Sequence, residues 1–220
     1  MATEEQDTNT PRALHGLEDG RASVRLRAAM SIGSAPDARC VGKLVERCAI
    51  EPDFSVRETL TWALTRHPAS ITVPLLIGEL RRERAQARSQ ALHTLSKIGD
   101  RRAWPAITRA LLSDDDDEVA RSAWRAAVVL VPEGEESGLA AALATQFGRG
   151  GREMRLSLSR ALVALGEEAG ATVRAAMTDP DPRVRHHARA TERLLRDPEA
   201  GFEDAIEEAK RVAVLQDHPG

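Results

Sequence analysis

Residues 51–66 read EPDFSVRETLTWALTR: an acidic turn with a proline, then an apolar residue, an arginine and a run with helical spacing of its apolar positions. An apolar residue, usually followed by arginine, opens a helix-like run of this kind at six places. The runs begin at Val24, Val56, Ala87, Val119, Met154 and Val184, so the steps between them are 32, 31, 32, 35 and 30 residues. Such a period is typical of a stacked helical hairpin. The sequence therefore predicts an extended helical array rather than a globule around one pocket.

Aspartates and glycines mark the expected ends of the second helix in several hairpins. Aspartate stands three positions before the opening apolar residue in three repeats, where its carboxylate can cap free backbone N–H groups. These residues are Asp53, Asp116 and Asp181. Glycine follows a second helix where a left-handed residue is expected at the C-terminus. The glycines in this position are Gly33, Gly99 and Gly166.

These signals divide the chain, because helical periodicity is strong throughout and no alternating strand pattern occurs. We expect an all-α, right-handed solenoid of about six hairpins. Its parts are a disordered lead over 1–10, a repeat domain over 11–196, and a capping helix with a frayed tail over 197–220. The repeats are expected at 11–35, 36–69, 70–99, 100–132, 133–166 and 167–196.

The composition excludes some classes of protein. The 220 residues are 42% hydrophobic but only 3% aromatic, so the core must be built from Ala, Leu and Val. The net charge of −3 lacks the basic excess of a typical nucleic-acid-binding protein. No run approaches the roughly 18 apolar residues of a membrane span, and MATEEQDTNT does not resemble a signal peptide. A cytoplasmic protein without a membrane partner is expected.

The repeated pattern resembles HEAT repeats, in particular the short phycobilisome lyase-type HEAT-like repeats. The matching stretches are EPDFSVRETLTWALTR (51–66), DDDDEVARSAWRAAVVL (114–130) and DPDPRVRHHARATERLL (179–195). The resemblance covers about residues 11–196 and implies the solenoid fold. It leaves the function open, since proteins of this group include scaffolds, adaptors, bilin lyase subunits, a di-iron hydroxylase and alkylpurine DNA glycosylases.

The resemblance also implies a ladder of ion pairs. In such repeats the arginine after the opening apolar residue pairs with an acidic residue of a neighbouring turn. The corresponding arginines are Arg25, Arg57, Arg88, Arg155 and Arg185. Repeat four has Ala120 at this position, and repeats three and five have Arg84 and Gly151 where repeat two has Asp53. We therefore expect the ladder to be interrupted in the middle of the array.

The second helices of a solenoid line its concave face, so their outward side chains are candidates for binding a partner. Apolar positions four residues apart must face the core, which turns the intervening positions outward. The outward stripe consists of Glu58, Trp62, His93, Arg121, Trp124, Arg125 and Arg160. Trp and Arg dominate binding hot spots because they combine large area with directional polar groups. The alternative for Trp62 and Trp124 is packing between adjacent repeats.

Two further features each allow two interpretations. The acidic run Asp114–Glu118 is typical of a solvated helix start, or it could hold a divalent cation or a basic partner. Glu58 is a surface residue paired with a nearby arginine, or an acidic catalytic group beside aromatic side chains.

No nucleophile elbow, phosphate loop, CxxC pair or HExxH motif occurs in the sequence. We therefore expect no catalytic residue, metal or cofactor. The main hypothesis is a non-enzymatic scaffold or adaptor that binds a protein or peptide in its groove. The alternative is a nucleic-acid-binding HEAT-like protein, possibly with alkylpurine DNA glycosylase-type activity, in which Arg121 and Arg125 hold phosphates and a tryptophan stacks on a base. A bilin lyase-like role is a third hypothesis.

Overall fold

The computed structural model describes residues 10–197 and is all-α, with no β-strand among these residues. The chain divides into two compact units, Met1–Pro132 and Glu133–Gly220. The all-α prediction is thereby confirmed. Nearly all of the expected disordered lead (1–10) and of the expected capping helix and tail (197–220) lies outside the described residues.

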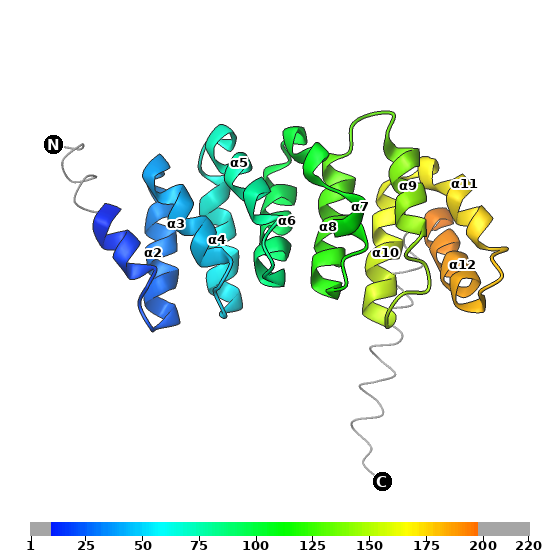
Figure 1. Ribbon diagram of the computed structural model, residues 1–220, viewed down its shortest axis with the longest axis horizontal. Helices are drawn as coiled ribbons and strands as arrows, with labels where there is room; N and C mark the ends of the chain where they lie inside the picture. The colour runs from blue at the N-terminus through cyan, green and yellow to red at the C-terminus, as the bar shows by residue number, and fades with distance from the viewer. Residues whose placement is uncertain (1–9, 198–220) are drawn as a thin grey trace, which may run out of the picture. The chain divides into compact units, whose positions relative to one another are not determined.

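The first unit contains four consecutive helical hairpins (Figure 1). A short helix over 10–16 precedes the labelled elements. These are α2 (Ala22–Ser34), η1 (Ala38–Cys40), α3 (Val41–Cys48), α4 (Phe54–Thr65), α5 (Ala69–Glu79), α6 (Ala85–Ile98), η2 (Arg101–Ala106), α7 (Arg109–Leu112) and α8 (Asp117–Leu130). The second helices α2, α4, α6 and α8 pack side by side in that order, and α3 and α5 form a further layer against α4 and α6.

Small side chains allow the second helices to approach one another closely. Ala120, Ala123 and Ala127 of α8 are fully buried, as are Leu60 and Leu92 of α4 and α6. Alanine loses no side-chain entropy on burial and keeps the helix surface narrow. The sparse aromatic content is therefore compatible with a close-packed core.

The second unit consists of α9 (Glu136–Ala144), α10 (Arg152–Ala164), α11 (Glu167–Ala176) and α12 (Pro182–Arg196). Helix α9 packs on α11, α10 packs on α12, and α11 packs on α12. The two-layer arrangement of the first unit is thus repeated here.

The predicted aspartate caps are confirmed. Asp53 accepts a hydrogen bond from the Val56 amide at 3.0 Å, and Asp116 accepts from the Val119 amide at 3.1 Å. Asp181 accepts from the Arg183 amide at 2.7 Å. Each carboxylate satisfies an N–H group that the first helical turn leaves without a partner.

The prediction that Gly33 ends a helix is wrong, whereas Gly99 does adopt the left-handed conformation, with φ of 70°, at the end of α6. Gly33 lies inside α2, and its φ is not positive. The position requires glycine for another reason. A Cβ there would collide with the Trp62 ring and lie 3.0 Å from the Ala63 Cα of α4. The glycine permits close packing of α2 on α4.

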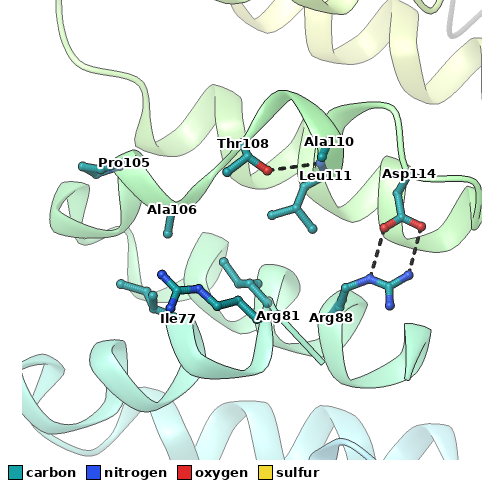
Figure 2. Close-up of a pocket in the computed structure, with 10 residues that line it drawn as sticks. Ile77, Arg81, Arg88, Pro105, Ala106, Thr108, Ala110, Leu111 and Asp114 are labelled. Atoms are coloured by element: carbon teal, nitrogen blue, oxygen red, sulfur yellow. Dashed lines mark hydrogen bonds and ion pairs between the residues drawn. The ribbon is translucent and has the colours of Figure 1, made fainter. Parts of the chain in front are cut away.

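Repeat four departs from the expected pattern in its first helix. In the repeat expected over 100–132, the first part of the hairpin is not one continuous helix but the 3₁₀ segment η2 followed by the four-residue helix α7. Pro105 lacks the N–H that an α-helix needs and disfavours helical geometry in the preceding residue. A cavity of about 280 Å³ lies beside this break, between the end of α5 and α7 (Figure 2).

In four of the second helices, α2, α4, α6 and α12, the arginine near the start of the helix binds the turn that precedes it. One guanidinium nitrogen, Nη1, donates to the backbone carbonyls six and five residues earlier in the chain. Arg25 reaches Asp19 and Gly20, Arg57 reaches Glu51 and Pro52, Arg88 reaches Arg82 and Glu83, and Arg185 reaches Asp179 and Pro180, at 2.7–3.0 Å. This arginine clamp joins the second helix to its own turn.

Two of the clamping arginines also pair with the next repeat. Arg25 binds both carboxylate oxygens of Glu51 at 2.7 Å. Arg88 binds both oxygens of Asp114 at 3.0 and 3.1 Å (Figure 2). The next turn after Arg57 has Arg82 at the equivalent position, and there Gln86 instead donates to the Glu51 carbonyl at 2.7 Å. The ladder expected from the sequence is therefore formed by Arg25 with Glu51 and by Arg88 with Asp114, and Arg57 between them makes no such pair within the described residues.

Glu51 is the most enclosed member of the ladder and is fully buried. Burial alone would raise the pKa of its carboxyl group. Hydrogen bonds from Arg25, the Asp53 amide and Arg47 outweigh burial and lower that pKa from 4.5 to about 2. Glu51 is therefore ionised at neutral pH and depends on Arg25 for compensation.

Replacing Arg25 with alanine should destabilise the protein by about 3–5 kcal/mol, because it leaves the Glu51 carboxylate buried and undercompensated. Urea denaturation followed by circular dichroism measures this loss. Arg21→Ala is the matched control, since Arg21 pairs with Asp19 in the same turn but is exposed. Equal losses for the two variants would contradict the importance of the buried pair.

A buried histidine joins three parts of the second unit. The His187 Nδ1 atom accepts a hydrogen bond from the Gly148 amide at 3.1 Å, so its proton resides on Nε2. Nε2 then donates to the Arg155 carbonyl at 2.9 Å and lies 3.1 Å from the Ser159 hydroxyl. Burial lowers the pKa of His187 to about 4, which keeps the ring neutral.

Stability of the second unit should therefore depend on pH below neutrality. The folded-state pKa of His187 lies below its ordinary value of 6.5. Its contribution to stability is complete above pH 6.5 and is lost as the pH falls towards 4. Denaturation midpoints measured across this range should fall less steeply for His187→Gln, which carries no titrating ring. Parallel curves for wild type and variant would refute this assignment.

Candidate functional site

The second helices of repeats two to four present one continuous surface. We call it the α4–α6–α8 face and define it by Glu58, Trp62, Arg66, His93, Lys97, Arg121 and Arg125. Residues four apart on one helix share a side, and α4, α6 and α8 lie side by side. The face contains five of the seven side chains expected in the partner-binding stripe. Arg66 and Lys97 were not recognised in the sequence, although each follows a recognised residue by one helical turn.

Trp62 is the large apolar side chain of this face and is 41% exposed. Its six-membered ring covers Gly33 of α2, so one side of the indole is packed and the other is open to solvent. Trp62 therefore packs between adjacent repeats, as one interpretation held, and also reaches the surface, where its contact with a partner stays a prediction. The ring is held in place without being buried.

Glu58 and His93 face each other across α4 and α6. Glu58 Oε1 and His93 Nε2 are 3.3 Å apart, but the atoms lack hydrogen-bond geometry and Nε2 has no hydrogen-bond partner. The contact is therefore a weak electrostatic one. Burial lowers the pKa of His93, and the nearby Lys97 and Arg125 lower it further, against the opposing effect of Glu58. The imidazole is consequently neutral at pH 7.

Arg121 and Arg125 share one carboxylate on α8. Arg121 donates to Glu118 Oε2 at 2.6 Å, and Arg125 donates to Glu118 Oε1 at 3.4 Å and to the Ser122 hydroxyl at 3.0 Å. The Arg125 side chain is 50% exposed. Ion pairs at such exposed positions contribute about 0–1 kcal/mol. Either guanidinium can therefore exchange Glu118 for a carboxylate of a partner at little cost.

The structure contradicts the assignment of Trp124 to the stripe. Trp124 is completely buried, and its indole N–H donates to the Leu112 carbonyl of α7 at 2.8 Å. It fills the space between α8 and the short α7, so packing is its role. Position in the repeat did not reveal this, because α8 buries eight of its 14 residues, including positions outside the apolar stripe. Base stacking on Trp124, which one hypothesis allowed, is excluded by its burial.

Arg160 lies on α10 of the second unit, where it is exposed. The α4–α6–α8 face belongs entirely to the first unit. Arg160 is therefore not part of the α4–α6–α8 face.

Three residues of the acidic run at the start of α8 make contacts that stabilise the fold. Asp114 pairs with Arg88, Asp116 caps the helix, and Glu118 binds two arginines. Among residues 10–197, no group of three or more His, Cys, Asp or Glu side chains is placed to hold a metal ion. The solvated helix start is the interpretation that these contacts favour.

Stacked hairpins in two layers define an α-helical repeat protein. A family model described as HEAT repeats matches residues 41–127, which include the whole α4–α6–α8 face. The resemblance to HEAT repeats expected from the sequence is thus confirmed over this segment. HEAT repeats commonly serve as scaffolds for protein interactions and are generally non-enzymatic.

Comparison with solved structures finds the crystal structure of an engineered protein determined by the Northeast Structural Genomics Consortium. Its sequence identity to this chain is 15% and its TM-score is 0.48, over 84% of this chain and 98% of that one. Comparison with curated proteins finds no match. Within residues 10–197, every helix is too short or too polar to cross a membrane.

The contact between Gly33 and Trp62 should control the position of the indole. Gly33→Ala is expected to displace the Trp62 ring, increasing its quenching by acrylamide and lowering stability by about 1–3 kcal/mol through overpacking. Gly78→Ala in α5 is the matched control, since a Cβ there meets nothing within 4 Å. Helix propensity should make that control neutral or slightly stabilising. Unchanged quenching in Gly33→Ala would show that Trp62 does not depend on this glycine.

Proposed function

We propose that this protein is a non-enzymatic scaffold or adaptor whose α4–α6–α8 face binds a protein or peptide partner. The observation that carries the proposal is the partly exposed Trp62, which packs on Gly33 and lies one helical turn from both Glu58 and Arg66. Most binding free energy at protein interfaces comes from a few such side chains.

The fixed position of Trp62 favours binding. A side chain that is mobile before binding must be ordered at a cost of about 0.5–1.5 kcal/mol. The Trp62 ring already rests against α2, so little of this cost remains. Helical repeats also keep the spacing between neighbouring side chains constant, which presents a preformed surface to the partner.

The buried reactive groups support a structural rather than a catalytic role. Burial raises the pKa of the Cys48 thiol to about 12, which disfavours the nucleophilic thiolate. His187 is neutral and holds backbone groups of the second unit together. On the face itself, Glu58 is exposed beside the neutral His93, and the arginine partner expected for it from the sequence is absent among the described residues.

A protein partner is favoured over nucleic acid. Arg121 and Arg125 are partly neutralised by Glu118, and the second tryptophan that could have stacked on a base is buried. The face therefore offers one exposed aromatic ring and dispersed charges. A nucleic-acid groove instead requires repeated phosphate contacts along a positively charged track.

Trp62→Ala should abolish capture of the partner. Immobilised wild-type protein is incubated with a lysate of the source cell, with and without nuclease, and bound proteins are identified by mass spectrometry. We expect a protein that wild type retains regardless of nuclease and that the variant loses. Leu75→Ala is the control, because Leu75 is an equally exposed apolar residue, at 42%, on the first helix α5.

The captured protein would then be purified, and its affinity would be measured for the wild-type protein, the Trp62→Ala variant and the Leu75→Ala variant. Recovery that depends on nucleic acid, or equal capture by the Trp62 and Leu75 variants, would reject the proposed function.

A further inference from the structure

The sixth residue after the opening apolar residue of each second helix changes from apolar to polar along the first unit. The residues at this position are Met30, Trp62, His93 and Arg125 on α2, α4, α6 and α8. Met30 and Trp62 are large apolar side chains, 49% and 41% exposed. His93 and Arg125 are polar, and Arg125 is cationic. A ligand that crosses the four helices therefore meets an apolar half and then a basic half.

Two unpaired cations add positive charge to the face, Lys97 in the basic half and Arg66 beside Trp62 in the apolar half. Arg66 and Lys97 follow Trp62 and His93 by one helical turn and are both exposed. Neither forms an ion pair with any residue of the described range 10–197. The face thus carries four cationic side chains and only two nearby carboxylates, Glu58 and Glu118. Glu118 is already engaged by Arg121 and Arg125. This excess of positive charge is complementary to an acidic partner.

Helix packing sets the spacing that such a partner needs. Axes of packed helices lie about 8–10 Å apart, and an extended peptide advances about 3.3 Å per residue. A peptide that crosses the helices therefore advances about three residues for each repeat. An extended segment fits this arrangement because every third residue of the segment lies opposite the next helix of the face.

We propose that the α4–α6–α8 face binds an extended acidic segment of a protein. A large apolar residue of the segment contacts Met30 and Trp62. Acidic residues about three and six positions away lie opposite Lys97 and Arg125. This proposal rests on the proposed scaffold function and adds the chemistry and spacing of the partner.

Glu58 is the one free carboxylate close to the apolar contact, 3.3 Å from His93. Its charge repels an acidic segment and selects against segments whose acidic residue adjoins the apolar one. Glu58→Gln should therefore tighten binding of the acidic segment while a neutral analogue is unaffected.

Selection from a display library of random twelve-residue peptides tests the spacing. The full chain is immobilised, and bound peptides are sequenced. We expect enrichment of a large apolar residue with Asp or Glu three and six positions away, in one direction along the peptide. Enrichment of basic peptides, of acidic peptides without this spacing, or of no peptides would overturn the proposal.

Fluorescence anisotropy of the best selected peptide then tests the residues. The double variant Lys97→Glu/Arg125→Glu should weaken binding roughly tenfold or more and reduce its dependence on salt. Arg81→Glu/Arg109→Glu makes the same change in net charge just after α5 and on α7, and should leave the affinity within about twofold. Equal losses of affinity in both double variants would show that only the net charge matters and would reject the contacts assigned to Lys97 and Arg125.

A single-stranded oligonucleotide of equal negative charge is the final competitor. Stronger binding of the oligonucleotide than of the selected peptide would reject the proposal. The result is separable from the proposed function, because a Trp62-dependent protein partner without an acidic segment would leave the scaffold function intact while refuting this inference.

Discussion

The arginine clamp is the interaction on which the turns before α2, α4, α6 and α12 depend. A turn between two helices leaves backbone carbonyl groups without helical partners, and these carbonyls are costly to bury unpaired. Arg25, Arg57, Arg88 and Arg185 each satisfy two of them with one guanidinium nitrogen. The remaining nitrogens are then free to reach the following turn, as Arg25 reaches Glu51. Lysine could not make both sets of contacts, because only arginine has this planar, multidentate geometry.

With the turns held by the clamp, most outward side chains of the second helices are not needed for the fold. Interior positions of α4, α6 and α8 hold the layers together, and the turns are held by arginine and aspartate. Outward positions such as those of Lys97 and Arg125 can then differ from repeat to repeat without loss of the fold. The chemistry of the face is consequently specific to this chain, although the scaffold is general.

The repeat pattern was sufficient to predict features that depend on local sequence. The all-α class, the HEAT resemblance and the caps at Asp53, Asp116 and Asp181 follow from spacing and side-chain chemistry within one turn. Features that depend on contacts between helices were not predictable in this way. Gly33 was misassigned because the need for a small residue arises from Trp62, which lies on another helix. Trp124 was misassigned because the shortened α7 leaves a space that only the structure reveals.

The sequence separations within the arginine clamp also bear on the order of folding. Each clamp joins residues five and six positions apart, whereas Arg25–Glu51 and Arg88–Asp114 join residues 26 apart. Closing a short loop loses less chain entropy than closing a long one. A nascent turn can thus acquire its native geometry before the next repeat has been synthesised. When the next repeat folds, its aspartate or glutamate can pair with an arginine that the clamp already holds in position. The clamp therefore favours assembly in which each hairpin packs on a hairpin that has already folded.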